Sequence, residues 1–310
     1  MSGRNVLRRL DWVSILIFIL LVGIGWLNIY SSTFSDEATS IFDTSQRYGK
    51  QLLFIGISLA SIILVMALEA NFYERFSSVF YIITILLLIG LFPFGKTIAG
   101  ATSWYGLGFF NLQPSELAKA ATALALAKYL SDIQTDIKRR KDQLIAIGIF
   151  VLPALLIIPQ PDPGSALVFF ALIFVLFREG LPLWYLGVAF VAIALFIATL
   201  MFGTVWVAIG LSLLLAVLYL LKKPSVKVPL LPVVGLYVLA LAFSLSVNFV
   251  FENVFEQRHR DRFTLWLRLE KDPDKLEEIR KTIGYNTYQS EKAIESGGWF
   301  GKFCLEGTRT

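Results

Sequence analysis

Residues 183–202 read LWYLGVAFVAIALFIATLMF and carry no charged side chain. The hydrocarbon core of a bilayer is about 30 Å thick, and an α-helix that rises about 1.5 Å per residue needs about 20 apolar residues to cross it. Further apolar runs lie at 12–29, 52–68, 76–92, 117–130, 144–158, 166–177, 205–221 and 230–250. The sequence therefore predicts an all-α polytopic membrane protein with about nine transmembrane helices.

The composition agrees with this class. Hydrophobic residues make up 56% of the chain, charged residues make up 16%, and the mean hydropathy is +0.68. These values are too apolar for a soluble domain. The single cysteine, Cys304, and the single histidine, His259, exclude a disulfide framework and any site built on several Cys or His ligands. The net charge of +5 does not indicate nucleic acid, because the basic residues cluster at the ends of apolar runs.

The basic residues also predict the orientation in the membrane. If every run crosses, one side carries most of the loop Lys and Arg residues, in the segments 4–9, 75, 138–141, 178 and 222–227. By the positive-inside rule the N-terminus is cytoplasmic and the final segment lies outside. The chain then divides into a transmembrane bundle, 1–250, and an extracytoplasmic loop, 251–310.

Two features of this topology have alternatives. The run 12–29 follows three arginines and could be a signal peptide, but it is longer than a usual signal core and no small-residue cleavage site follows, which favours a retained span. The hairpin 205–250 is the weakest pair of spans. Its removal as a pair leaves the predicted orientation unchanged.

Three predicted outside segments carry the polar residues. In the first, Gln113-Pro114-Ser115-Glu116 leads into a helix that contains Lys119. Proline suits the first turn of a helix, so Glu116 and Lys119, three residues apart, share one face at its outer end. They either contribute to a functional site or form a local ion pair at the membrane edge.

The second segment is Pro159-Gln160-Pro161-Asp162-Pro163-Gly164-Ser165. Three prolines around one carboxylate make a rigid, non-helical corner that holds Asp162 at a fixed depth. The alternative is a tight turn in which Asp162 caps the following helix through backbone donors.

The third segment is the loop after 250. Arg258, Arg260, Arg262 and Arg268 recur at roughly helical spacing with apolar residues between them, which predicts a basic amphipathic segment in the membrane interface, or else a solvated helix face. Next come Lys271-Asp272-Pro273-Asp274 and a charged insert, 275–281, followed by Gly284-Tyr285 and Gln289-Ser290.

Together these segments resemble the bacterial SEDS family (shape, elongation, division and sporulation), and most closely its RodA branch. The resemblance rests on Gln113-Pro114-Ser115-Glu116 with Lys119, on 160–166, on Asp272-Pro273, on Gly284-Tyr285 with Gln289-Ser290, and on 296–298 with 307–308. It implies a peptidoglycan glycosyltransferase in the bacterial cytoplasmic membrane, which polymerises lipid II on the outer face for cell elongation and shape, with a class B penicillin-binding protein as its transpeptidase partner.

The resemblance also implies site residues. Asp272 matches the essential catalytic aspartate of the family's long outside loop. Substrate-binding roles fall on the matched motif residues, which are Gln113, Ser115, Glu116, Lys119, Asp162, Tyr285, Gln289 and Ser290.

Four departures from the family pattern bear on these assignments. The insert 275–281 separates Asp272 from Gly284-Tyr285, so Asp274 is an alternative catalytic residue. Ser103 precedes Trp104 where the family often has a basic residue, and the hairpin 205–250 is additional to the family plan. The chain also ends at Thr310, where relatives continue into further spans. We therefore expect a C-terminally incomplete chain that is inactive by itself.

The chemistry of glycan polymerisation fits this residue set. A sugar hydroxyl displaces a polyprenyl pyrophosphate from another sugar, so one carboxylate is needed as base and positive groups are needed at the leaving group. Asp272 is suited to act as the base, and Lys271 and the arginine-rich segment beside it are suited to stabilise the leaving group. A divalent cation, Mg²⁺ or Mn²⁺, could bridge pyrophosphate and carboxylate, although no dedicated metal motif is visible.

The alternative functions are a flippase or other polytopic transporter, and a scaffold that only docks partners. A transporter places charged groups along a pathway near the midplane. Here the acidic residues lie at the outer ends of the predicted spans. A scaffold would leave those residues without a role.

Overall fold

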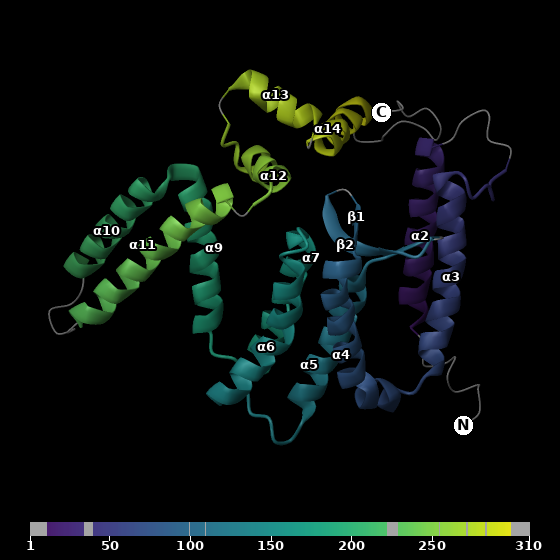
Figure 1. Cartoon of the computed structure of the whole chain (residues 1–310), viewed down its shortest axis with the longest axis horizontal. Coiled ribbons are helices and arrows are strands. Elements are labelled where there is room, and N and C mark those ends of the chain that lie inside the picture. Colours follow the sequence, from purple (N-terminus) through teal and green to yellow (C-terminus); the bar gives the residue numbers. More distant parts are fainter. Residues whose placement is uncertain are drawn as a thin grey trace. The chain divides into compact units, whose positions relative to one another are not determined.

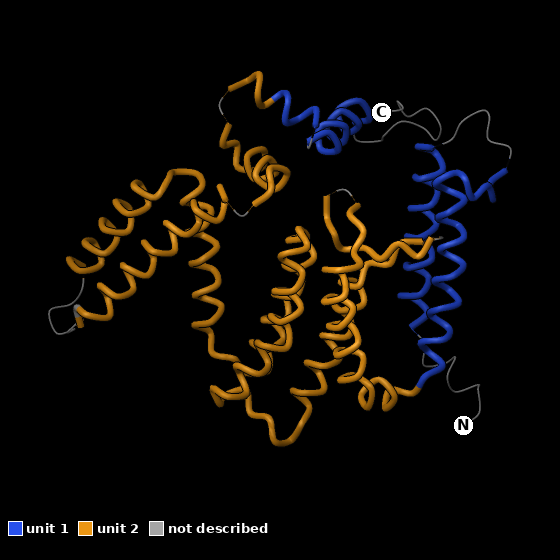
Figure 2. Tube along the Cα trace, in the orientation of Figure 1, with its two compact units in different colours: residues 1–68, 277–310 blue, residues 69–276 orange. Residues whose placement is uncertain are grey.

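The computed structural model describes residues 11–33, 40–98, 100–108, 110–221, 229–253, 255–270, 272–282 and 284–298. The chain forms two compact units. One contains residues 1–68 and 277–310, and the other contains residues 69–276 (Figure 2). Lys271 and the motif residues 307–308 lie outside the described residues.

The first unit contains the helical pair α2 (Trp12–Thr33) and α3 (Arg47–Ala67). The Trp26 indole donates to the Tyr48 carbonyl at 3.1 Å, and the rings of Tyr30 and Tyr48 meet edge to face at 5.2 Å. Tyr48 is buried, whereas both helices otherwise expose apolar side chains along their length. Such all-round apolar helices are suited to hydrocarbon. The unit also includes α14 (Tyr285–Gly297).

The second unit has its core among α4 (Ala70–Phe94), α5 (Pro114–Ser131), α6 (Arg140–Ile157), α7 (Pro163–Phe170) and α8 (Ile173–Arg178) (Figure 1). Small residues permit close helix packing. Ala118, Ala146, Ala154 and Ala166 are buried there beside large side chains such as Phe150. This core fixes the start of α5 against the start of α7.

Three longer helices follow, α9 (Trp184–Phe202), α10 (Thr204–Leu221) and α11 (Leu230–Asn253). The hydroxyls of Thr199 and Ser244 lie 2.8 Å apart between α9 and α11, and the Asn248 amide donates to Thr204 at 2.9 Å. Polar pairs of this kind hold apolar helices together where hydrophobic burial gives little drive. Gly203, at φ 80°, makes the sharp turn from α9 into α10.

The helical membrane-protein class is confirmed, and each predicted span except 166–177 lies within one helix, to within a residue at either end. Of the helices in the described part of the chain, six are long and apolar enough to cross a membrane: α2, α3, α4, α9, α10 and α11. For α5, α6 and the α7–α8 pair the crossing stays a prediction. The predicted span 166–177 is interrupted, because the amides of Ala171 and Leu172 bond three residues back and tighten the turn between α7 and α8.

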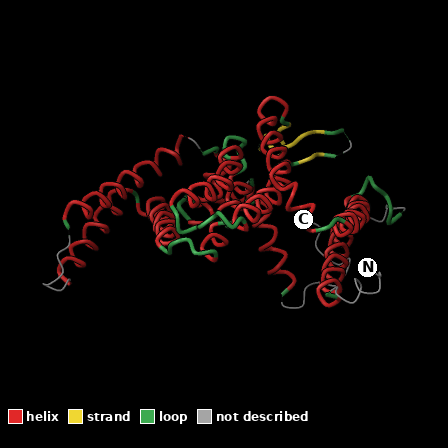
Figure 3. The backbone as a smooth tube through the Cα atoms, turned by 90° about the horizontal axis from the view of Figure 1, so that it is seen from below, coloured by secondary structure: helices red, strands yellow, loops and turns green. Residues whose placement is uncertain are grey.

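The loop between α4 and α5, the first of the predicted outside segments, holds a small antiparallel sheet that the sequence did not predict. Its order is β1 (Lys96–Ile98), β2 (Ala101–Gly106) and β3 (Asn111–Leu112), shown in yellow in Figure 3. Strands this short give no usable alternation pattern. Tyr105 in β2 donates its hydroxyl to the Leu87 carbonyl at 2.8 Å and so anchors the sheet to α4.

The segment after 250 is mostly helical where it is described. The arginine-rich stretch forms α12 (Gln257–Leu267), and Arg268 ends it in the left-handed conformation at φ 52°. The place of α12 in the membrane interface, or else as a solvated face, stays a prediction. The charged insert forms α13 (Pro273–Lys281), with an i,i+4 ion pair of 2.6 Å between Glu277 and Lys281.

Candidate functional site

Asp162 is the centre of the polar corner between α6 and α7. Its Oδ1 accepts from the Ser165 backbone amide at 3.1 Å, and its Oδ2 accepts from the Ser165 hydroxyl at 2.7 Å. The predicted alternative of a helix cap is therefore confirmed, with Pro163 in the first turn as the corner sequence requires. A substrate-binding role for Asp162 stays a prediction.

Gln113 brings the first outside segment to this corner. Its Nε2 donates to Oδ2 of Asp162 at 2.9 Å. Gln113 directly precedes α5, which begins at Pro114, so its side chain is placed by the helix start. Two of the predicted site residues thus meet across 49 positions of sequence.

Gln160 is a corner residue whose contacts the sequence did not reveal. It is 2% exposed, and its Nε2 donates to the Leu88 carbonyl of α4 at 2.9 Å. Its Oε1 is buried and has no hydrogen-bond partner among the described residues. The predicted rigidity of the corner therefore comes from this buried amide as well as from the prolines.

Glu116 and Lys119 form the ion pair that their spacing predicts. Lys119 Nζ lies 2.8 Å from Oε1 of Glu116, and both side chains reach the surface of the described structure. Exposed pairs of this type contribute about 0–1 kcal/mol to stability. No hydrogen bond or ion pair in the described structure joins them to Asp162, so their shared cavity with it stays a prediction. Ser115 is buried beside them, and its Oγ has no partner among the described residues.

The helix α12 is attached to the same corner. Arg258 donates from Nη2 to the Pro161 carbonyl at 2.7 Å, while its Nε lies 2.8 Å from Oε2 of Glu256. The Nε–H does not point at that carboxylate, so the second contact is an ion pair without an aligned hydrogen bond. The loop between α4 and α5, the proline corner and α12 therefore meet at one end of the second unit (Figure 1).

His259 shares this environment. Burial is the main cause that lowers the pKa of its imidazole below the ordinary value of 6.5, and the neighbouring Arg258 guanidinium lowers it further. Glu256 and the Pro161 carbonyl act in the opposite direction and do not outweigh them. The neutral imidazole is thus the favoured form at neutral pH.

Asp272 is exposed and occupies the position before α13. Its Oδ1 accepts from the Asp274 amide at 3.1 Å, and its own amide donates to Glu270 Oε1 at 3.1 Å. Asp followed by Pro is a favourable helix start, which explains this local structure. Its second carboxylate oxygen has no partner in the described part of the chain. The catalytic role of Asp272 stays a prediction, as does the alternative at Asp274.

The remaining predicted site residues lie on α14, in the other compact unit. Tyr285 and Gln289 are four positions apart and share one helix face. The Ser290 hydroxyl donates to the Asn286 carbonyl at 2.8 Å, within its own helix. Their grouping with Asp272 and Asp162 stays a prediction.

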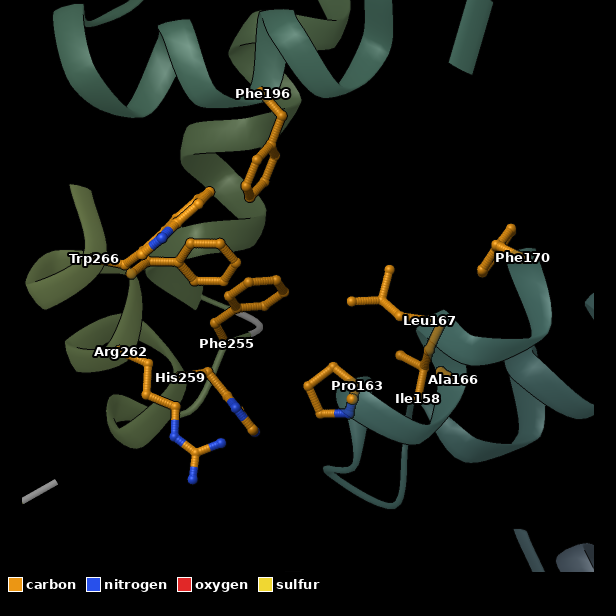
Figure 4. A pocket seen from close by; sticks show the side chains of 12 residues that line it. Ile158, Pro163, Ala166, Leu167, Phe170, Phe196, Phe255, His259, Arg262 and Trp266 are labelled. Atoms are coloured by element: carbon orange, nitrogen blue, oxygen red, sulfur yellow. The ribbon is translucent and has the colours of Figure 1, made fainter. Parts of the chain in front are cut away.

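An apolar pocket of about 520 Å³ lies beside the corner, between α7, α9 and α12 (Figure 4). Leu167 and Phe170 line it from α7, and Phe196 lines it from α9. His259 and Arg262 contribute its polar groups from α12. No hydrogen bond or ion pair of Arg262 is found among the described residues. The pocket therefore combines an apolar lining with the cation of Arg262. It also contacts Pro163, the residue that follows Asp162.

Two curated relatives show which proteins this chain resembles. The peptidoglycan glycosyltransferase RodA of Treponema pallidum is 30% identical and matches 97% of this chain and 72% of its own length. The peptidoglycan glycosyltransferase MrdB of Escherichia coli K12 is 34% identical over 63% of this chain and 50% of its own. The chain thus spans only about half the length of the second relative.

A solved structure shows the same fold. A chain in "Structural coordination of polymerization and crosslinking by a peptidoglycan synthase complex" superimposes with a TM-score of 0.53 at 30% identity, over 62% of this chain and 54% of that one. The profile of the FtsW/RodA/SpoVE family, described as cell cycle protein, matches residues 11–209, which include the motifs around Gln113 and Asp162. The chain belongs to the FtsW/RodA/SpoVE family, the SEDS proteins.

Proposed function

We propose that the complete protein is a peptidoglycan glycosyltransferase, which polymerises lipid II into glycan strands on the outer face of the bacterial cytoplasmic membrane during cell elongation. The observation that carries the proposal is the apolar pocket beside the Gln113–Asp162 corner, with Arg262 and His259 at its edge. A lipid-linked sugar needs a hydrocarbon-lined volume and a cation for its phosphates side by side. Relatives that carry the glycosyltransferase name support the same activity.

In the proposed reaction Asp272 is the general base. It takes the proton from the attacking hydroxyl of one sugar while that oxygen bonds to the anomeric carbon of the other. The bond from that carbon to the pyrophosphate breaks, and polyprenyl pyrophosphate leaves with the bonding electrons. The oxygen of Asp272 that does not cap α13 is suited to accept the proton. Arg262 offers a positive charge to the leaving group.

In this proposal a divalent cation is bound by the substrate and not by a protein site. The described residues contain no group of three Asp, Glu, His or Cys side chains that could hold a metal ion, so a protein-built cage does not fit here. We propose that Mg²⁺ or Mn²⁺ arrives on the pyrophosphate, and we assign it no step.

A transpeptidase partner is part of the proposal. The similar solved chain comes from a complex that couples polymerization with crosslinking. By analogy, a class B penicillin-binding protein would crosslink the strands that this protein makes. The alternative of a flippase is less favoured, because the ionisable groups of the corner lie at helix ends rather than at mid-span.

The test uses the complete gene product, purified in detergent and incubated with lipid-linked disaccharide pentapeptide. Glycan strands resolved by length are the expected product, and Asp272→Asn is the inactive control. Translocation of the lipid across vesicles without strand formation would overturn the proposal in favour of a flippase.

A further inference from the structure

The carbonyl of Pro161 is an acceptor that the local sequence leaves open. Proline at 159, 161 and 163 keeps the corner out of a helix. In the first backbone hydrogen bond of α7, the Ala166 amide donates to the Asp162 carbonyl. The Pro161 carbonyl is instead used by α12, through the 2.7 Å bond from Nη2 of Arg258. A backbone acceptor at the corner thus becomes the attachment point of a segment 97 residues later.

The same guanidinium lies against Gly100 in the first outside loop. Gly100 has φ 82°, and a Cβ added there would overlap Nη1 of Arg258 and lie 2.8 Å from its Cζ. An alanine there would require the guanidinium to move away, so glycine permits this close approach. Arg258 therefore touches the sheet-bearing loop and the proline corner at once, from α12.

The consequence for the reaction follows from the chain path. Arg258 lies near the start of α12, and the segment that leaves the end of α12 leads to Asp272. Glu256, two residues before Arg258, forms an ion pair with its Nε, and this ion pair limits the rotation of the guanidinium. A planar guanidinium can serve two partners in a fixed geometry, which an ammonium group cannot do.

We propose that Arg258 is a positioning residue for glycan polymerisation: by joining Pro161 and Gly100 to α12, it holds the Asp272 segment in register with the Gln113–Asp162 corner. The proposal rests on the proposed function for its effect on rate. The contact itself does not depend on that function, so it can be tested separately.

The first experiment measures hydrogen exchange in the complete protein with Arg258→Met. Exchange should rise in 257–267 and at the amides of Gln160 and Asp162, since Pro161 and Pro163 carry no N–H, while the buried core of α4 to α6 keeps its protection. Unchanged exchange in α12 would overturn the proposal. The exchange measurement gives a result even when the purified protein makes no glycan. It therefore tests the Arg258 contact independently of the proposed function.

The second experiment compares two glycines with matched backbones. Gly108 has φ 75° and open space at its Cβ position, whereas Gly100 has nearly the same φ and the Arg258 contact. Alanine at either site brings the same left-handed strain. We expect Gly100→Ala to lower kcat about 10-fold to 100-fold relative to Gly108→Ala, with KM for the lipid substrate changed less, because misplacement of a base affects the chemical step.

Double variants decide whether Arg258 is the cause. In an Arg258→Met background, Gly100→Ala and Gly108→Ala should have equal kcat, since the guanidinium that the alanine at 100 would overlap is absent. Arg258→Lys should restore part of the rate by reaching the Pro161 carbonyl alone. Equal effects of the two glycine variants in the parent protein, or full activity of Arg258→Met, would overturn the proposal.

Discussion

The Nε2 of Gln113 lies 2.9 Å from Oδ2 of Asp162, and this hydrogen bond joins the start of α5 to the start of α7. The carboxylate of Asp162 accepts two further donors, both from Ser165. Asp162 thus accepts three hydrogen bonds, one of which joins the starts of α5 and α7. A carboxylate used in this way is suited to shape a site, and a different carboxylate is needed as base.

Asp162→Ala should lower the free energy of unfolding by about 1–2 kcal/mol, because the helix cap is lost and the Gln113 amide loses its acceptor. Asp162→Asn should cost less, since its amide oxygen can still accept from Ser165. Thermal unfolding in detergent measures both. Asp132→Ala, which removes a carboxylate with only a local loop bond, is the control. Equal stability of Asp162→Ala and the parent protein would show that the helix cap and the Gln113–Asp162 hydrogen bond contribute nothing to stability.

Asp272→Asn in the complete protein should reduce polymerisation by about 10²- to 10⁴-fold, the usual range for loss of a general base. Asparagine caps a helix about as well as aspartate, so α13 should stay folded. The rate is measured with lipid-linked disaccharide, and circular dichroism checks the fold. Asp274→Asn is the matched control and should be milder. If Asp274→Asn is the inactive variant, the insert 275–281 has shifted the catalytic register to Asp274.

The lowered pKa of His259 predicts a pH dependence of the α12 contact. A histidine whose folded pKa lies below its unfolded value contributes stability above the unfolded pKa, near 6.5, and this contribution is lost as pH falls below that value. Protonation would add a charge beside Arg258 and Arg262, and the opposite effects of Glu256 and the Pro161 carbonyl do not outweigh this. Protection factors in 257–267, corrected for the intrinsic pH dependence of amide exchange, should therefore fall as the pH is lowered from about 7.5 to about 5.5. In His259→Gln this loss of protection should be smaller, and an identical loss in both proteins would assign it to other groups.

The orientation is tested by labelling a single cysteine. In a Cys304→Ser background, Asn253→Cys should react with a membrane-impermeant thiol reagent in intact spheroplasts, because the loop bias of Lys and Arg places the end of α11 outside. Gln134→Cys, in the predicted inside loop, should react only after lysis. The reverse pattern would invert the predicted topology.

Local contacts in the candidate site were accessible from the sequence. The Glu116–Lys119 pair follows from helical spacing and is found at 2.8 Å. Asp162 as a helix cap follows from its place before Pro163. The cap of α13 by Asp272 has the same Asp-Pro signature.

By itself the sequence determined the membrane class, the helical segments and these local caps, because each depends on apolar run length or on residues within four positions. It did not determine the sheet, whose strands are too short to show alternation. It also did not determine that Gln113 reaches Asp162, or that Arg258 reaches Pro161 and Gly100. Those contacts join residues 49 or more positions apart. Helix packing in the α4 to α8 core brings them together, and no local pattern records how distant helix ends are placed by that packing.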